Sequence, residues 1–182
     1  MKVNYLVFLS ALLMAACSSM TVLEKESKRH ALDKMAMTAI AGLIAMDATL
    51  QKQIDDSLGY AVANMKVTKV PLVGAGGGEG VLFNQQNNTQ SYFTVSRFDV
   101  GGGWGARSYK VLMIINNSEV MDRIANGTWE FQAGVEASVG TAAAEGGSGS
   151  EGFSLHVLSD GGASATATAR VIKVSVNNEL MY

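Results

Sequence analysis

The sequence has little of three things on which common classes of protein depend: cysteine, proline and charge. Of its 182 residues, one is cysteine, one is proline, and only 16% carry a charged side chain. A single cysteine excludes an intramolecular disulfide framework, and a single proline gives little sign of a long linker. The formal net charge of −2 offers no basic field for nucleic acid, so we expect no nucleic-acid partner.

Motifs of catalysis and metal binding are also missing. The sequence contains no HExxH, GxSxG or SxxK pattern, and its two histidines, His30 and His156, lie far apart. His156 falls within the apolar run FSLHVL, where a hydrogen-bonded structural histidine is expected more often than a catalytic base. We therefore predict a protein that is not an enzyme and that has no cofactor, catalytic residue or metal site.

The densest glycine run is PLVGAGGGEGVLF, at residues 71–83. It does not match a nucleotide-binding loop. A Walker loop needs lysine and then serine or threonine after its last glycine, whereas Val81 follows Gly80. A dinucleotide fingerprint that starts at Gly74 would need a sixth-position glycine, and the sequence has Glu79 there.

The N-terminus resembles a bacterial lipoprotein signal. Lys2 precedes an apolar run from Tyr5 to Ala16, which is too short to span a bilayer. The run ends in MAAC at residues 14–17, which predicts that Cys17 is acylated and acts as a lipid anchor. Ser18, in place of an aspartate after the cysteine, implies sorting to the outer membrane. The alternative is an ordinary signal peptide with a chance cysteine.

The expected organisation is a signal peptide at residues 1–16, an acylated tether at 17–28 and a single domain at 29–182. Apolar residues three or four apart predict one amphipathic helix, or two with a break, over about Lys28 to Leu58. The charges of residues 28–56 sum to zero, which favours core packing over a basic membrane-surface helix. The apolar stripe consists of Leu32, Met35, Ala39, Leu43, Met46, Leu50, Ile54 and Leu58.

From residue 66 onward the period of the apolar residues changes to two, which is typical of half-buried strands. A turn is expected at Asn84 to Thr89, and a short helix at Ser118 to Ala125 with Ser118 as its cap. The strand candidates are Val81–Phe83, Tyr92–Phe98, Arg107–Ile115, Trp129–Gly140, Phe153–Leu158 and Ala163–Val176.

Consecutive strands joined by short turns favour an antiparallel sheet. The glycines at 74–80 and 101–105 are then expected at strand ends or at tight bends. The predicted fold class is α+β, with an N-terminal amphipathic helix packed on a mostly antiparallel, strongly bent β-sheet that forms a sandwich or a partly closed barrel.

Four pieces of the sequence follow one another in a recognisable order: GAGGGEGVLF, then Tyr92-Phe93, then GGGWGARSYKVLMII, then a short helix that leads to NGTWEFQAGVEASVG. In content and order this set resembles the SYLF domain, a lipid-binding module, over about residues 55–176. The resemblance implies a non-enzymatic domain that binds membrane lipids, with phosphoinositides as the ligands of eukaryotic members and secreted or lipid-anchored forms in bacteria. The balanced charge of residues 28–56 departs from the basic segment expected of phosphoinositide-binding members.

Basic residues beside the glycine runs are the candidate lipid-binding residues. Each could neutralise a lipid phosphate, and Arg107 could do so with a bidentate contact. The alternative is that they are solvated charges at strand ends. The candidates are Lys66, Lys69, Arg107 and Lys110.

Two hypotheses for the function follow. The first is a membrane-anchored, phospholipid-binding lipoprotein of the bacterial envelope, held on the outer membrane and facing the periplasm. The second is an envelope structural or protein-interaction module, whose only lipid contact is the acylated Cys17 and whose sheet edge or glycine loops meet a protein partner.

Overall fold

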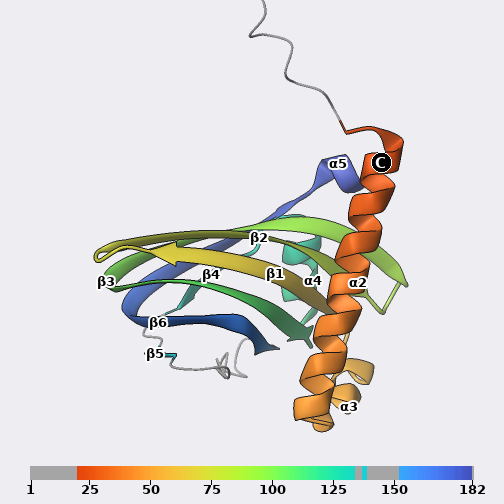
Figure 1. Ribbon diagram of the computed structural model, residues 1–182. Helices are drawn as coiled ribbons and strands as arrows, with labels where there is room; N and C mark the ends of the chain where they lie inside the picture. The colour runs from red at the N-terminus through yellow and green to blue at the C-terminus, as the bar shows by residue number, and fades with distance from the viewer. Residues whose placement is uncertain (1–19, 134–136, 139–151, 182) are drawn as a thin grey trace, which may run out of the picture.

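The computed structural model describes residues 20–133, 137–138 and 152–181 (Figure 1). It is an α+β domain in which one long helix stands against a strongly curled antiparallel sheet, which confirms the predicted fold class. The predicted signal peptide and Cys17 lie outside the described residues. The helices are α2 (Val22–Met46), α3 (Thr49–Asp55), α4 (Ser118–Ala125) and α5 (Asn178–Met181).

One long strand organises the sheet. The first part of β3 pairs with β2, and its second part, after a bend, pairs with β1. Because β1 and β2 also pair with each other, these three strands curl into a partly closed barrel, and β6 follows β3 along its other edge. The strands are β1 (Gly59–Lys69), β2 (Val73–Asn84), β3 (Thr89–Ile115), β4 (Glu130–Ala133), β5 (Ala137–Ser138) and β6 (Phe153–Val176).

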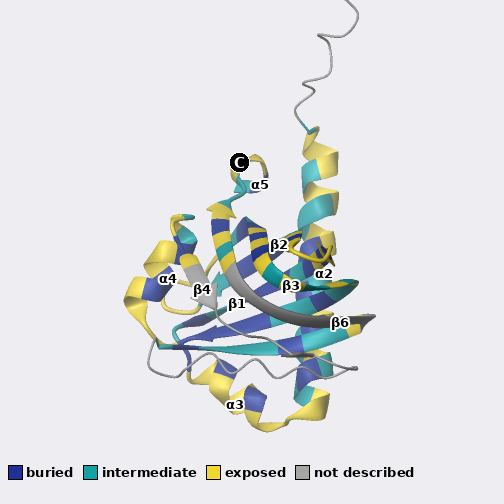
Figure 2. Ribbon diagram, turned by 90° about the vertical axis from the view of Figure 1, so that its left-hand side faces the viewer, coloured by how far each residue is buried: buried dark blue, intermediate teal, exposed yellow. Residues whose placement is uncertain are grey.

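The curl gives the sheet an inner face and an outer face, and each face has its own hydrophobic core (Figure 2). The inner face is filled by side chains such as Met65, Phe93 and Met113, together with α4 and Trp129. The outer face carries α2, whose buried residues pack against side chains that include Val62 and Leu112. The buried residues of α2 are Leu32, Ala36, Ala39 and Leu43.

The glycines of β2 make the tight curl of the inner face possible. Gly76, Gly78 and Gly80 pair with Val67, Met65 and Ala63 of β1, and paired residues of antiparallel strands point to the same face. A Cβ on Gly78 would lie 2.4 Å from the backbone oxygen of Asn64 and 2.5 Å from the Met65 sulfur. The run therefore lies inside a strand. Of the two places expected for it, a strand end was wrong, and a tightly curled part of the sheet is where it lies.

The second glycine run does lie at a bend. Gly101, Gly103 and Gly105 have positive φ angles of 137°, 139° and 144°, a conformation that side-chain-bearing residues rarely adopt. The bend lies where β3 leaves β2 and begins to pair with β1. These glycines therefore let the continuous strand β3 pair with both β2 and β1, whereas the sequence predicted two separate strands.

The helical region differs from expectation at its start. The helix begins at Val22 rather than at about Lys28, so the predicted tether is shorter than expected. The physical reason is a capping box: the Glu24 amide donates to the Thr21 hydroxyl, and the Thr21 amide donates to the Glu24 carboxylate. The expected break is present between α2 and α3, and Met46, placed at that break, is exposed instead of buried.

Three smaller expectations also need correction. The cap of α4 is Asn117, whose side chain accepts from two backbone amides, rather than Ser118. The period-two region begins at Gly59, earlier than residue 66, because β1 is a full strand. Of the strand expected at Trp129 to Gly140, β4 and β5 are present, Trp129 precedes β4 without being part of a strand, and residues 134–136, 139 and 140 lie outside the described residues.

Replacing Gly78 with alanine should destabilise the fold by about 1–3 kcal/mol, because the new methyl group overpacks the inner face against backbone. The matched control is Gly77→Ala on the outer face, where the nearest atom, the Val95 carbonyl oxygen, would lie 3.5 Å away. That variant should change the free energy of unfolding by less than about 0.5 kcal/mol. Urea denaturation of both variants measures the difference, and equal midpoints would show that the glycines are not needed for the curl.

Candidate functional site

The structure divides the four predicted lipid-binding residues between the two faces of the sheet. Val67 of β1 packs in the inner core, Arg107 of β3 is its register partner, and Lys69 is two residues further along β1. Lys69 and Arg107 therefore both lie on the inner face. Lys66 and Lys110 lie on the outer face. The division follows from sequence spacing, because residues three apart on a strand point to opposite faces. The four therefore do not form one site.

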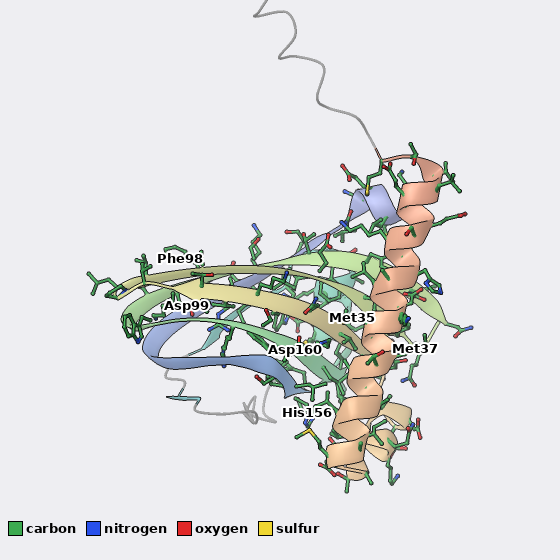
Figure 3. The ribbon with its side chains drawn as sticks, in the orientation of Figure 1. Met35, Met37, Phe98, Asp99, His156 and Asp160 are labelled. Carbon is green, nitrogen blue, oxygen red and sulfur yellow. The ribbon has the colours of Figure 1, made fainter. Side chains whose placement is uncertain are left out.

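The two outer lysines have different surroundings. Lys66 is exposed and lines a groove of about 380 Å³ between α2 and the sheet. In the same groove the Lys28 ammonium lies 2.5 Å from the Glu79 carboxylate. Lys110 forms an ion pair with Asp160, so much of its charge is already balanced (Figure 3). Of the two, Lys66 is the better placed for a phosphate in solution or on a membrane.

A buried polar cluster closes one end of the inner face. The guanidinium of Arg97 donates to both carboxylate oxygens of Asp99, at 2.9 and 2.8 Å, and to the Tyr109 hydroxyl at 2.5 Å. The guanidinium of Arg107 lies over the Tyr109 ring, 4.7 Å from its centroid. Burial alone would lower the pKa of Arg97, but its hydrogen bonds to Asp99 and Tyr109 raise it, so Arg97 stays charged.

Lys69 belongs to the same end of the inner face. It pairs in register with Gly74, which pairs in turn with Asp99, and the missing side chain of Gly74 lets its two neighbours approach each other. The side chain of Lys69 is buried, and its ammonium has no hydrogen-bond partner in the described part of the chain. A buried ammonium without a partner is costly, which makes this residue unusual.

An exposed apolar surface, called here the apolar tip, covers the end of the sheet away from α2. Figure 3 shows Phe98 at this end, far from Met37 on the helix. The turn between β1 and β2 is tied to the bend of β3 by a hydrogen bond from the Gly101 amide to the Leu72 carbonyl, 2.9 Å long. Trp104, just before the register partner of Lys69, is 74% exposed. The apolar tip consists of Val70, Leu72, Val73, Phe98, Val100, Trp104 and Val171.

Two exposed lysines stand in a row across the outer face, directly behind the apolar tip. Lys66 pairs with Gly77, Gly77 with Ser96, and Ser96 with Lys173. The next row toward the tip, two residues or about 7 Å further along, holds Phe98 and Val171. Glu130 of β4 pairs with Lys173 and is the acidic residue nearest to it in the register. We call Lys66 and Lys173 the lysine row.

The sequence patterns identified Lys66 but missed the apolar tip and Lys173. Phe98 and Val100 belong to a strand whose alternation was visible, but alternation alone does not show which apolar face stays uncovered. His156 was expected to be structural, and its ring accepts or donates a 3.1 Å hydrogen bond with the Ser154 hydroxyl. Burial lowers the pKa of His156, an effect that Asp47 partly offsets.

Within the described residues, no group of three or more histidine, cysteine, aspartate or glutamate side chains is arranged to hold a metal ion. No helix in this part of the chain is both long enough and apolar enough to cross a bilayer. A scan against protein-family models finds no family that matches the chain, and a search of curated proteins finds no match. The resemblance to the SYLF domain therefore stays a prediction.

Replacing Asp99 with asparagine should destabilise the protein by about 3–5 kcal/mol, because it leaves Arg97 charged and buried without its carboxylate. The control is Asp160→Asn, which breaks the Lys110–Asp160 ion pair. That pair is more exposed than Arg97–Asp99, so the variant should lose only about 0–1 kcal/mol of stability. Chemical denaturation at neutral pH gives both values. Similar losses in the two variants would mean that the buried pair contributes no more than a surface pair.

Proposed function

We propose that the protein is a non-enzymatic, phospholipid-binding lipoprotein of the bacterial envelope, anchored to the outer membrane through Cys17 and facing the periplasm. The observation that carries the proposal is the apolar tip. Soluble domains rarely leave a contiguous set of large apolar side chains exposed unless the set meets a partner or a membrane. The resemblance to a lipid-binding module, stated above, favours a membrane as the partner.

The composition of the apolar tip suits insertion into the interface of a bilayer. Each large apolar side chain that moves from water into the acyl region contributes about 1.5–3 kcal/mol. Tryptophan is favoured at the level of the head groups, where its ring is buried and its N–H stays close to water. Trp104 and Phe98, 74% and 54% exposed, are free to move into such an environment without unfolding the sheet.

The lysine row adds charge complementarity to the apolar contact. With the tip inserted, Lys66 and Lys173 would lie about 7 Å behind Phe98 and Val171, near the depth of the lipid phosphates. An anionic surface attracts each such lysine by about 1 kcal/mol. No acidic side chain belongs to the apolar tip in the described structure, and Asp99 is turned to the inner face.

An acyl anchor and a protein surface would act together. A domain tethered by acylated Cys17 stays close to the bilayer, so even a weak contact by the tip is populated because its effective concentration is high. In the competing hypothesis the anchor is the same, but the apolar tip binds a protein partner. Vesicle binding by the domain without its anchor distinguishes the two hypotheses.

The variant Phe98→Ser/Trp104→Ser, in protein that lacks residues 1–17, should bind phosphatidylglycerol-containing vesicles at least about tenfold more weakly than its parent. The loss is expected because two large apolar side chains no longer enter the bilayer. Co-sedimentation measures the binding. In the parent, the fluorescence of Trp104 should also shift to shorter wavelength when vesicles are added.

The control for this experiment is Met37→Ser, which removes a side chain that is 63% exposed on α2, far from the tip. It should bind vesicles as the parent does. If the parent binds no vesicles at all, or if the control and the tip variant lose equal affinity, the membrane-contact proposal fails. In that case, crosslinking in cells that recovers one dominant protein would favour the interaction module.

Lys66→Gln/Lys173→Gln should weaken binding to anionic vesicles by roughly thirtyfold at low salt, because each lysine contributes about 1 kcal/mol at an anionic surface. High salt should reduce the difference, since exposed charges are screened. The matched control is Lys34→Gln/Lys52→Gln, two exposed lysines on the helices. A lysine-row variant that behaves like this control would remove these residues from the binding surface.

A further inference from the structure

We propose that the inner face of the sheet holds a second ligand site, which binds a single-chain amphiphile with an anionic head group. The head would lie at the end formed by Lys69 and Arg97, and the chain would enter the apolar cavity beside it. This site lies on the opposite face of the sheet from the lysine row. The inference therefore does not rest on the membrane contact proposed above.

The cavity is apolar over most of its wall. It measures about 70 Å³ and lies between the strands of the curl, with α4 and Trp129 closing one side. Met65, Phe93 and Met113 represent the aliphatic and aromatic groups that line it. This apolar part of the wall offers no side-chain hydrogen-bond partners to a polar ligand, so the part of a ligand that fits here is a hydrocarbon group.

The polar groups of the wall gather at one end. Arg97 and Tyr109 line the cavity there, with Arg107 stacked on the Tyr109 ring and Lys69 beside Asp99. Of the charged side chains at this end, Arg97 lines the cavity and is paired with Asp99, whereas the ammonium of Lys69, across Gly74 from Asp99, has no hydrogen-bond partner among the described residues. A ligand that meets both parts of the cavity should therefore be apolar at one end and negatively charged at the other.

Lys69 gives the strongest indication that this end binds an anion. Its side chain is only 5% exposed, and its ammonium has no hydrogen-bond partner among the described residues. Buried charges in proteins are normally paired, because removal from water is costly. An anionic head group would supply a charge-assisted hydrogen bond to this ammonium, and Asp99, already held by both arms of Arg97, is the carboxylate that shares the site.

A carboxylate and a phosphate monoester would both satisfy this ammonium, and the shared feature is a compact anion on one alkyl chain. The volume of the cavity suits part of a single chain rather than the two chains of a complete phospholipid. The remainder of a longer chain would have to lie outside the cavity. The site therefore fits fatty acids or single-chain phosphate esters.

The two tryptophans of the chain allow a direct test, because Trp129 lines the cavity and Trp104 lies on the apolar tip. In a Trp104→Phe background, Trp129 is the one reporter, and a bromine atom on a bound chain quenches its fluorescence at short range. The probes are ω-bromohexanoate, ω-bromohexyl phosphate and the uncharged ω-bromohexanol, whose chains are short enough to keep the bromine close to the cavity, each below the concentration at which it forms micelles. The two anions should quench Trp129 at concentrations about tenfold or more below the alcohol.

Lys69→Met tests the head-group contact. It should weaken the binding of both anions by about tenfold or more while leaving that of the alcohol unchanged. It should also leave the fold as stable as the parent or more so, because it removes a buried charge without a partner. The control Lys34→Met, at an exposed position of α2, should change neither the binding of the anions nor the stability of the fold.

Three outcomes would overturn the inference. The first is the absence of quenching by any probe in folded protein. The second is equal half-saturation by the anions and the alcohol, a comparison that needs no Lys69 variant. The third is unchanged anion binding in Lys69→Met. Preference for the carboxylate over the phosphate ester, or the reverse, identifies the head group and supports the site in either case.

Discussion

The inner face of β2 is nearly free of side chains, and the shape of the molecule depends on this constraint. Gly74, Gly76, Gly78 and Gly80 leave space that is filled by larger residues of β1 and β3. With that space available, the sheet can curl until one strand, β3, pairs with both β2 and β1. The curl then creates an enclosed inner face and an outer face for α2, so the cavity, the buried ion pair and the helix position all follow from it.

Much of the fold could be predicted from local patterns. The apolar stripe predicted one helix or two with a break, of which the structure has two, and α4 was predicted with its observed bounds. The strand β2 was recognised only at its end, because glycine has low strand propensity and carries no pattern of alternation. The continuity of β3 and the capping box at Thr21 were missed, since both depend on positions that a count of apolar residues ignores.

The candidate site was less predictable than the fold. Lys66 and Lys69 were grouped because both lie beside the first glycine run, yet three residues along a strand place them on opposite faces. The same spacing separates Arg107 from Lys110. If β1 had been recognised as a strand from Gly59, the alternation of its residues between the two faces would have shown this division. The lysine row could not be predicted from spacing along one strand. Lys66 and Lys173 lie in one row across four strands, and the register of those strands is a tertiary property.

The contact between the first and last described helices has a consequence for how the chain folds. Arg29 of α2 donates a hydrogen bond of 2.6 Å to the carbonyl of Leu180 in α5, and β6 completes the sheet just before it. Nascent domains generally begin to fold from the N-terminus, but here the contacts of the N-terminal helix are complete only when the C-terminal residues have emerged. The meander of β1 to β3 can form early and offers most of the apolar surface on which α2 packs. The contacts of α2 with α5 then join the two ends of the described chain, so they are among the last to form.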